Sequence, residues 1–249
     1  MKSFKTFLDE GVDDPAIFKA VFLAGGPGSG KSFIVGKTGL PALGYRVINS
    51  DDAFEAGLAK AGLEMTPDNI FSPQGQEIRG KAKSVTKKKE VRSMIGRLGL
   101  VIDGTGKDSD KIARQAKSLK GLGYDAAMIF VNTDLDTALN RNRMRARSLP
   151  DKEVTAYWKT VQSNIGKFQT LFGKDKFLVV DNSDGKDYKA ETLRAYKDIR
   201  KFTDKPPESK KAKDWIEKQR ELKRTGGQRD AKRLPGKSMK IKTRSGKIR

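Results

Sequence analysis

Short apolar runs alternate with amphipathic segments along most of this chain. Runs of four to eight mostly apolar residues have the length of strands buried inside a sheet. They lie at residues 18–24, 45–48, 98–103, 124–131 and 177–180. Because helical patterns separate them, this order predicts βαβ units and an α/β fold, in which a parallel sheet of about five strands is covered by helices on both faces.

The segments between the runs carry apolar residues at helical spacing or begin at residues that cap helices. Helices are predicted at 1–10, 31–38, 50–62, 76–97, 108–122, 135–147, within 150–172, at 188–202 and at 209–224. Residues 66–75, which include two prolines and an asparagine, are predicted to form a loop. In 1–10, Phe4, Phe7 and Leu8 would share one helical face, which would pack on the domain or bind a partner.

The first apolar run leads directly into a glycine-rich octet, Gly25 to Ser32, which reads GGPGSGKS. It satisfies the phosphate-loop pattern of glycine, four residues, Gly-Lys and Ser or Thr. Glycines let the backbone aim N–H groups at phosphate oxygens, and the positive end of the following helix adds to the attraction. In such a loop Lys31 reaches the β- and γ-phosphates, and the Ser32 hydroxyl is a ligand of Mg²⁺. Nucleoside triphosphate binding is therefore predicted, through Gly26, Gly28, Ser29, Gly30, Lys31 and Ser32.

Polar side chains also follow the later predicted strands. Because ligands bind at the carboxyl ends of parallel strands, these groups are expected near the phosphate loop. Asp51 is a candidate general base for an acceptor hydroxyl, although helix capping would also explain Asp51 and Asp52 after Ser50. Asp103 ends the third strand and is a candidate metal-organising carboxylate, or simply a turn residue. Asn182, after the last strand, is predicted to contact the nucleotide.

Four arginines lie within seven residues, from Arg141 to Arg147. On a helix Arg141 and Arg145 would share one face, and Arg143 and Arg147 another. The guanidinium is a planar fork suited to phosphate oxygens, so one such face over a nucleotide would stabilise charge on a transferring phosphoryl group. A solvated helix face is the alternative.

The composition restricts the chemistry further. The chain has 249 residues, a formal net charge of +21, no cysteine and no histidine. Disulfides and thiolate chemistry are excluded, a zinc site is not expected, and a general base must be a carboxylate or a less usual group. Since no apolar run approaches the roughly 18 residues of a membrane span and no signal-peptide core begins the chain, we expect a cytoplasmic protein without membrane contact.

The charge is unevenly distributed. Residues after 203 contain 17 Lys and Arg against six Asp and Glu, and so carry +11 of the net charge. We therefore divide the chain into an N-terminal segment (1–15), a phosphate-loop domain (16–203) and a basic tail (204–249), with disorder predicted after residue 224. The tail is predicted to aid solubility, or to bind nucleic acid or an acidic protein through its charge.

These motifs, in this order, resemble the P-loop kinase family that includes the kinase domain of phage polynucleotide 5′-kinase and the zeta-toxin kinases; many phage kinase-like proteins look similar. The match runs from about Ala20 to Asn182 through GGPGSGKS, VINSDD, the TKKKE region at 86–90, LVIDGTG, RNRMR and SLPD. The resemblance implies ATP and Mg²⁺ as cofactors. It also implies roles for Lys31 and Ser32 at the phosphates and metal, Asp51 as catalytic base, Arg141 and Arg145 as lid arginines, and Asp103 or Thr105 near the metal and γ-phosphate.

One departure concerns the acceptor. Polynucleotide kinases of this family have an arginine three residues after the catalytic aspartate, where it grips the substrate phosphate, but this chain has Phe54. The prediction is a kinase that transfers the γ-phosphate to a hydroxyl, with the 5′-hydroxyl of a polynucleotide as first candidate. The alternatives are a zeta-toxin-like kinase of a sugar nucleotide or other small molecule, and a nucleotide-dependent nucleic-acid-binding or assembly protein with little turnover.

Overall fold

The structure is a computed structural model that describes residues 11–145 and 148–225. The predicted helix over 1–10, Arg147 and the part of the tail after Thr225 lie outside the described residues.

The centre of the fold is a parallel sheet of five strands in the order β2-β3-β1-β4-β5. The strands are β1 (Lys19–Ala24), β2 (Tyr45–Ile48), β3 (Gly99–Asp103), β4 (Asp125–Asn132) and β5 (Phe177–Asp181). In the register, Val21 of β1 lies opposite Val101 of β3 and Ala127 of β4. All six residues of β1 are buried, as expected for a central strand covered on both faces. The predicted fold class is confirmed.

Helices cover both faces of the sheet. They are α2 (Lys31–Lys37), α3 (Asp51–Lys60), α4 (Pro67–Phe71), α5 (Pro73–Ile95), α6 (Ser109–Gly121), α7 (Leu135–Arg143), α8 (Asp151–Ser163), α9 (Ile165–Phe172), α10 (Tyr188–Asp204) and α11 (Lys210–Thr225), with short 3-10 turns η1 (Leu40–Leu43) and η2 (Lys174–Lys176). Phe22 faces a core that includes residues of α6, α9 and α11, whereas Val21 and Leu23 face a core completed by α2 and α10. In the described part of the chain no helix is both long and apolar enough to cross a membrane.

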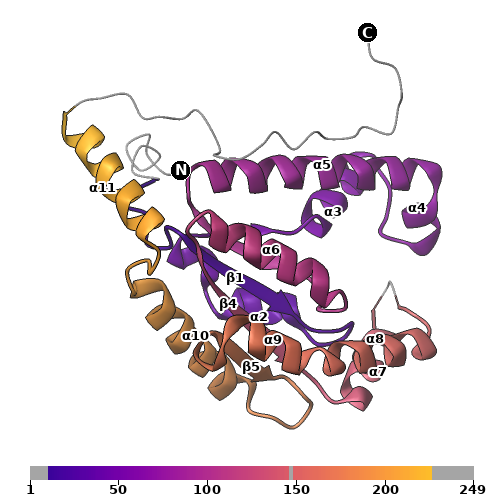
Figure 1. Ribbon diagram of the computed structural model, residues 1–249. Coiled ribbons are helices and arrows are strands. Elements are labelled where there is room, and N and C mark those ends of the chain that lie inside the picture. The colour runs from indigo at the N-terminus through magenta and orange to yellow at the C-terminus, as the bar shows by residue number, and fades with distance from the viewer. Residues whose placement is uncertain (1–10, 146–147, 226–249) are drawn as a thin grey trace.

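Helices α3, α4 and α5 form a separate lobe (Figure 1), and α5 contacts the edge strand β2. Phe54, Leu58, Ile70 and Ala82 are its own small core. Helix α5 is hydrogen-bonded to the edge strand β2, because Lys89 Nζ donates to the Val47 carbonyl at 2.9 Å. The lobe therefore lies against the edge strand β2.

Besides the end of α7, which is described with the site, two sequence predictions about helix boundaries are wrong. The predicted loop at 66–75 contains α4 and the start of α5, because Thr66 and Ser72 each cap a helix whose first residue is proline. The single helix predicted within 150–172 is two helices, separated at Asn164. The Asn164 side chain donates to the carbonyls of Gly106 and Lys107, both at 3.0 Å, and so ties this break to the loop after β3.

Helix α11, at the start of the basic tail, packs on the body of the protein. Ala212 is fully buried, and the Trp215 ring meets Phe18 edge-on with centroids 5.4 Å apart. At its far end Lys223 forms an ion pair with Asp13 at 2.7 Å. The predicted helix is confirmed, and its apolar side belongs to the core.

Candidate functional site

The glycine-rich loop joins the central strand to α2, as predicted, because β1 ends at Ala24 and α2 begins at Lys31. Gly28 and Gly30 have φ of +79° and +80°, which side chains with a Cβ rarely adopt. A Cβ on Gly28 would also collide with the Ala138 backbone, so this glycine is required by conformation and by packing.

Lys31 lies among the side chains of the predicted site. Its Nζ donates to the Gly25 carbonyl at 2.6 Å. Burial lowers the pKa of Lys31, the negative charges of Asp103 and Asp51 act to raise it, and the positive charge of Arg145 acts to lower it. Side chains predicted from three separate motifs thus lie within electrostatic reach of one ammonium group.

Asp103 ends β3 next to Leu23 of β1. Burial raises the pKa of this carboxyl, the Lys31 ammonium opposes that shift, and the carboxylates of Asp51 and Asp52 add to it. Its Oδ1 is buried and has no hydrogen-bond partner in the structure. A buried acceptor left open in this way suits a metal-bound water or a hydroxyl.

The donor set fits Mg²⁺ held jointly with phosphates. Within 11–145 and 148–225 no three acidic side chains gather into a metal cage. Mg²⁺ commonly takes one or two protein oxygens together with phosphate oxygens and water. Ser32, exposed in the first turn of α2, and the open Asp103 Oδ1 are the groups that would hold it.

Asp51 and Asp52 occupy the first turn of α3 and are exposed. The expected capping by Ser50 is not observed, since its side chain makes no cap hydrogen bond. Instead the Asp51 N–H donates to the Asn49 side chain at 2.9 Å. Among the described residues, neither carboxylate accepts a hydrogen bond, so both are open to a ligand.

Phe54, one turn after Asp51, points into the α3–α5 lobe. It is 2% exposed and packs in the core of the α3–α5 lobe. The Arg79 guanidinium covers its ring at 4.4 Å. The position that holds an arginine in the polynucleotide kinases is therefore a packing position in this chain.

The predicted helix over 135–147 ends early, at Arg143. The Asn142 side chain donates to the Leu149 carbonyl at 2.7 Å and accepts from the Leu149 N–H at 3.1 Å, which turns the chain back. The prediction that Arg141 and Arg145 share a helical face is therefore wrong. Arg145 is exposed beyond the helix end, yet its charge still acts on Lys31.

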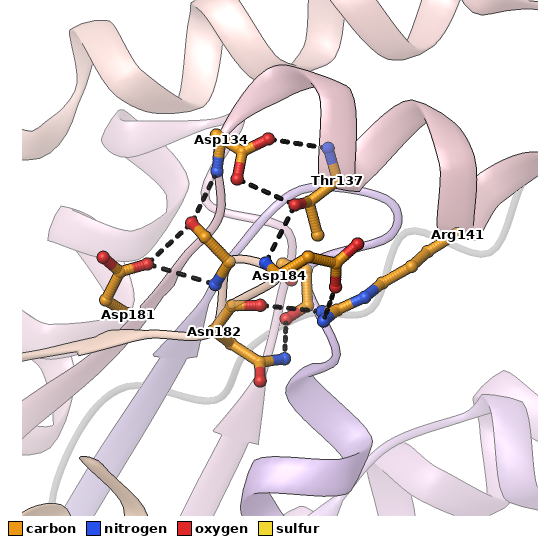
Figure 2. A network of polar contacts seen from close by, with 8 residues as sticks. Asp134, Thr137, Arg141, Asp181, Asn182 and Asp184 are labelled. Atoms are coloured by element: carbon orange, nitrogen blue, oxygen red, sulfur yellow. Dashed lines mark hydrogen bonds and ion pairs between the residues drawn. The ribbon is translucent and has the colours of Figure 1, made fainter. Parts of the chain in front are cut away.

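Arg141 is held by the loop after β5. One of its terminal nitrogens donates to the Asn182 carbonyl at 2.8 Å, and the other pairs with Asp184 at 2.6 Å. The Asn182 side chain is buried and donates to the Ser29 carbonyl of the phosphate loop at 2.8 Å (Figure 2). Of the predicted nucleotide-contacting residues, Asn182 and Ser29 are therefore buried against each other.

Two residues of this network, Thr137 and Asp184, were missed by sequence reasoning. The Thr137 hydroxyl donates to Asp134 at 2.7 Å and accepts from the Asp184 N–H at 3.0 Å (Figure 2). Hydrogen bonds from the Thr137 N–H and hydroxyl hold the pKa of the Asp134 carboxyl below its usual range. The sequence pattern does indicate Asp134 as the N-cap of α7. It does not indicate that α7 is hydrogen-bonded to the loop after β5.

A second group of contacts, also missed, joins helix α8 to the end of β4 and to the loop after β3. Trp158 donates to the Thr133 carbonyl at 2.8 Å, and Gln162 donates to the Asn132 side chain at 2.8 Å. The Lys107 ammonium lies over the Tyr157 ring at 4.0 Å from its centroid. Helix α8 and the loop after β3 are thus in direct contact.

Comparison with known proteins gives one family match. The model of a family described as AAA domain matches residues 21–166, which is more than half of the chain and contains the phosphate loop, Asp51, Asp103 and Arg141. No curated protein matches this chain.

Solved structures that are similar to this chain have low sequence identity to it. A chain of the AvrRxo1-ORF1:AvrRxo1-ORF2 complex with sulphate ions is 16% identical with a TM-score of 0.52, over 71% of this chain and 62% of that one. For the complex with ATP, the sequence identity is 16% and the TM-score 0.51, over 71% of this chain and 61% of that one. For a gluconokinase from Sinorhizobium meliloti 1021, the sequence identity is 14% and the TM-score 0.46, over 75% of this chain and 94% of that one. The present chain spans only about three fifths of the AvrRxo1 chain.

Proposed function

This chain belongs to the AAA domain family, and we propose that it is an ATP- and Mg²⁺-dependent kinase that transfers the γ-phosphate to a hydroxyl. The observation that carries the proposal is the convergence of Asp51 and Asp103 on Lys31. A phosphate loop by itself accounts for Lys31 and Ser32 but not for the two carboxylates. The two carboxylates, Asp103 at the end of β3 and Asp51 at the start of α3, would supply the two further functions of a kinase, metal organisation and proton acceptance.

The donor would bind along the phosphate loop. Lys31 would exchange its hydrogen bond to the Gly25 carbonyl for the β- and γ-phosphates, and the burial that lowers its pKa also strengthens its attraction to them. Bound Mg²⁺ would neutralise charge on the phosphates. Ser32 and Asp103 are the residues that would hold it.

In the transfer step, the acceptor oxygen forms a bond to the γ-phosphorus while the bond from phosphorus to the β–γ bridging oxygen breaks. The electron pair leaves with ADP, and the hydroxyl proton passes to the Asp51 carboxylate. Arg145, which has no side-chain partner among the described residues, would stabilise the charge that develops on the transferring group. The products are ADP and a phosphate monoester.

For the acceptor we propose the 5′-hydroxyl of a polynucleotide first. The net charge of +21 and the run of lysines on α5, beside the site, support a polyanionic substrate. The burial of Phe54 against Arg79 instead supports a smaller acceptor, such as a sugar nucleotide, because the family's phosphate-gripping position is filled. The basic tail would serve the polynucleotide acceptor by electrostatic contact.

Transfer from radiolabelled ATP to 5′-hydroxyl DNA and RNA, nucleosides and sugar nucleotides tests both acceptors. We expect one class to be labelled. The Asp51→Asn variant should then lose about 10²- to 10⁴-fold in kcat with ATP affinity unchanged, as for loss of a general base. The control is Glu55→Gln, an exposed change on the same helix. Absence of any labelled product from the parent chain would support the binding-protein alternative; full activity of Asp51→Asn would exclude Asp51 as the base.

A further inference from the structure

A groove with a volume of about 720 Å³ lies at the start of the central strand β1, where Lys19 is part of its lining. One wall comes from the residues that lead into β1, and the other from α11 and the linker that precedes it. Because the phosphate loop follows the opposite end of β1, at Ala24, the groove is separate from the proposed kinase site. We propose that this groove binds the N-terminal segment of the same chain, residues 1–10.

Part of the groove lining is apolar. Val12 and Ile17 belong to the wall that leads into β1. On the other wall, Pro207 comes from the linker, and Ile216 of α11 is half-buried and packs against the main core. The volume lies within the roughly 300–1,000 Å³ of ordinary ligand pockets, so the groove can take up several apolar side chains.

The N-terminal segment carries apolar side chains in a matching arrangement. Phe4, Phe7 and Leu8 would share one face of the helix predicted over 1–10. An isolated helix of this length is only marginally stable in water, so it needs a surface to pack on. Burial of the two aromatic rings and the leucine in the groove would remove that face from water.

The place where the segment joins the body also fits the groove. Asp13 forms an ion pair with Lys223 at 2.7 Å, so residues 1–10 lead into the body beside the C-terminal end of α11. The groove-lining residues of α11 extend over Lys213–Arg224, which is about 17 Å at 1.5 Å per residue. A helix of ten residues is about 15 Å long. A segment that runs back along α11 from this junction would therefore match the groove in length.

The charges agree with this direction. The segment is acidic where it joins the body, at Asp9 and Glu10, and has two lysines nearer its start. In the groove, Arg220 lies toward the C-terminal end of α11, and within the described part of the chain its side chain makes no hydrogen bond or ion pair. Asp204 lines the groove from the end of α10, before the linker to α11. Opposite charges would therefore meet at both ends of the groove.

Binding of the segment would cover a second side of α11. Ala212 and Trp215 already face the body of the protein, where the Trp215 ring meets Phe18. The groove side of the helix would be covered by residues 1–10. Because the basic tail continues from α11, the segment would help to fix the point at which the tail leaves the body.

Disulfide trapping in the full-length protein tests this contact, because the chain has no native cysteine. Leu8→Cys and Glu217→Cys place one thiol in the segment and the other on the groove side of α11. We expect mild oxidation to form an intramolecular disulfide, which requires Cβ atoms about 3.5–4.5 Å apart. The control combines Leu8→Cys with Asp214→Cys, because Asp214 is exposed on the same helix but does not line the groove. The control pair should form its disulfide at least tenfold more slowly.

A further substitution in the trapping pair tests the apolar face of the segment. Phe7→Asp should slow trapping about tenfold or more, because it removes a large apolar side chain from the contact. Thr6→Asp introduces the same charge on the other side of the predicted helix and should leave the trapping rate unchanged.

Three outcomes would overturn the inference. The first is equal trapping, or no trapping, with Glu217→Cys and Asp214→Cys. The second is a trapping rate that Phe7→Asp does not change. The third is a covalent dimer in place of the intramolecular disulfide, which would identify a second copy of the chain as the source of the bound segment.

Discussion

The side-chain amide of Asn182 donates a hydrogen bond to the backbone carbonyl of Ser29 across 2.8 Å. The two residues are 153 positions apart in the sequence, one after the last strand and one in the phosphate loop. Both are buried, and the Asn182 carbonyl in turn accepts from Arg141. The conformation of the phosphate loop therefore depends on the loop after β5 and, through it, on α7.

Asn182→Ala should destabilise the protein and weaken nucleotide binding together. The substitution leaves the buried Ser29 carbonyl without its donor, which costs about 1–3 kcal/mol. Denaturant unfolding and ATP-analogue titration measure the two effects. Asn140→Ala is the control, because Asn140 is exposed on α7 and, in the described part of the chain, its side chain accepts a hydrogen bond only from Arg143, at 3.3 Å. Equal behaviour of the two variants would contradict the role given to Asn182.

Gly28→Ala should disrupt the loop, whereas Gly26→Ala should be tolerated by the fold. An alanine at φ of +79° costs about 1–2 kcal/mol in backbone strain alone, and its Cβ would meet the Ala138 backbone. At Gly26 a Cβ has no neighbour within 4 Å. The midpoint of thermal unfolding distinguishes the two. An unchanged midpoint for Gly28→Ala would mean that the loop adopts another conformation.

Arg141 and Arg145 should differ in their kinetic effects. Arg145→Ala removes a guanidinium that has no side-chain partner among the described residues, so we expect a loss of about 10²- to 10³-fold in kcat. Arg141→Ala removes contacts to Asn182 and Asp184 and should chiefly raise the KM for ATP. Arg143→Ala is the control, since Arg143 pairs with Asp151 at the surface. Identical kcat and KM changes in the first two variants would argue against separate roles.

Asp103→Asn should stabilise the fold at neutral pH while reducing activity. Burial raises the pKa of this carboxyl, so its contribution to stability is fully present below the unfolded-state pKa and is lost as the pH rises through the folded-state pKa. The variant should therefore unfold at a higher temperature than the parent chain at pH 7, and the gap should close toward pH 3. Thermal unfolding over this range measures it, with the exposed change Glu55→Gln as control. A gap that does not vary with pH would contradict the assignment.

Truncation should separate the two parts of the basic tail. Ending the chain after Thr225 removes nine Lys and Arg and one acidic residue, and should weaken nucleic-acid binding and flatten its salt dependence. Ending it after Asp204 also removes Trp215 from Phe18, which should lower the unfolding free energy by about 3 kcal/mol or more. Electrophoretic mobility shifts at several salt concentrations and denaturant unfolding test the two expectations. Unchanged nucleic-acid affinity after the shorter truncation would exclude the tail as a binding element.

The sequence alone predicted the strands, their parallel arrangement and the phosphate loop. These features depend on neighbours along the chain: apolar runs bury themselves as strands, and Gly28, Gly30 and Lys31 act within a few residues of one another. The order of elements then placed Asp51 and Asp103 at the same edge of the sheet, because parallel strands share a carboxyl end. Both carboxylates act on Lys31, as that placement requires.

Tertiary structure decided between arrangements that the local sequence pattern allows equally. The spacing of Arg141 and Arg145 fits one helical face, but the Asn142 side chain bonds to Leu149 and ends the helix between them. Phe54 occupies a position one turn from Asp51 that could face a ligand, yet packing against Arg79 buries it. The hydrogen bond from Asn182 to Ser29 joins residues far apart in sequence. Such contacts depend on how side chains meet once the elements have packed, whereas propensity and periodicity describe each element alone.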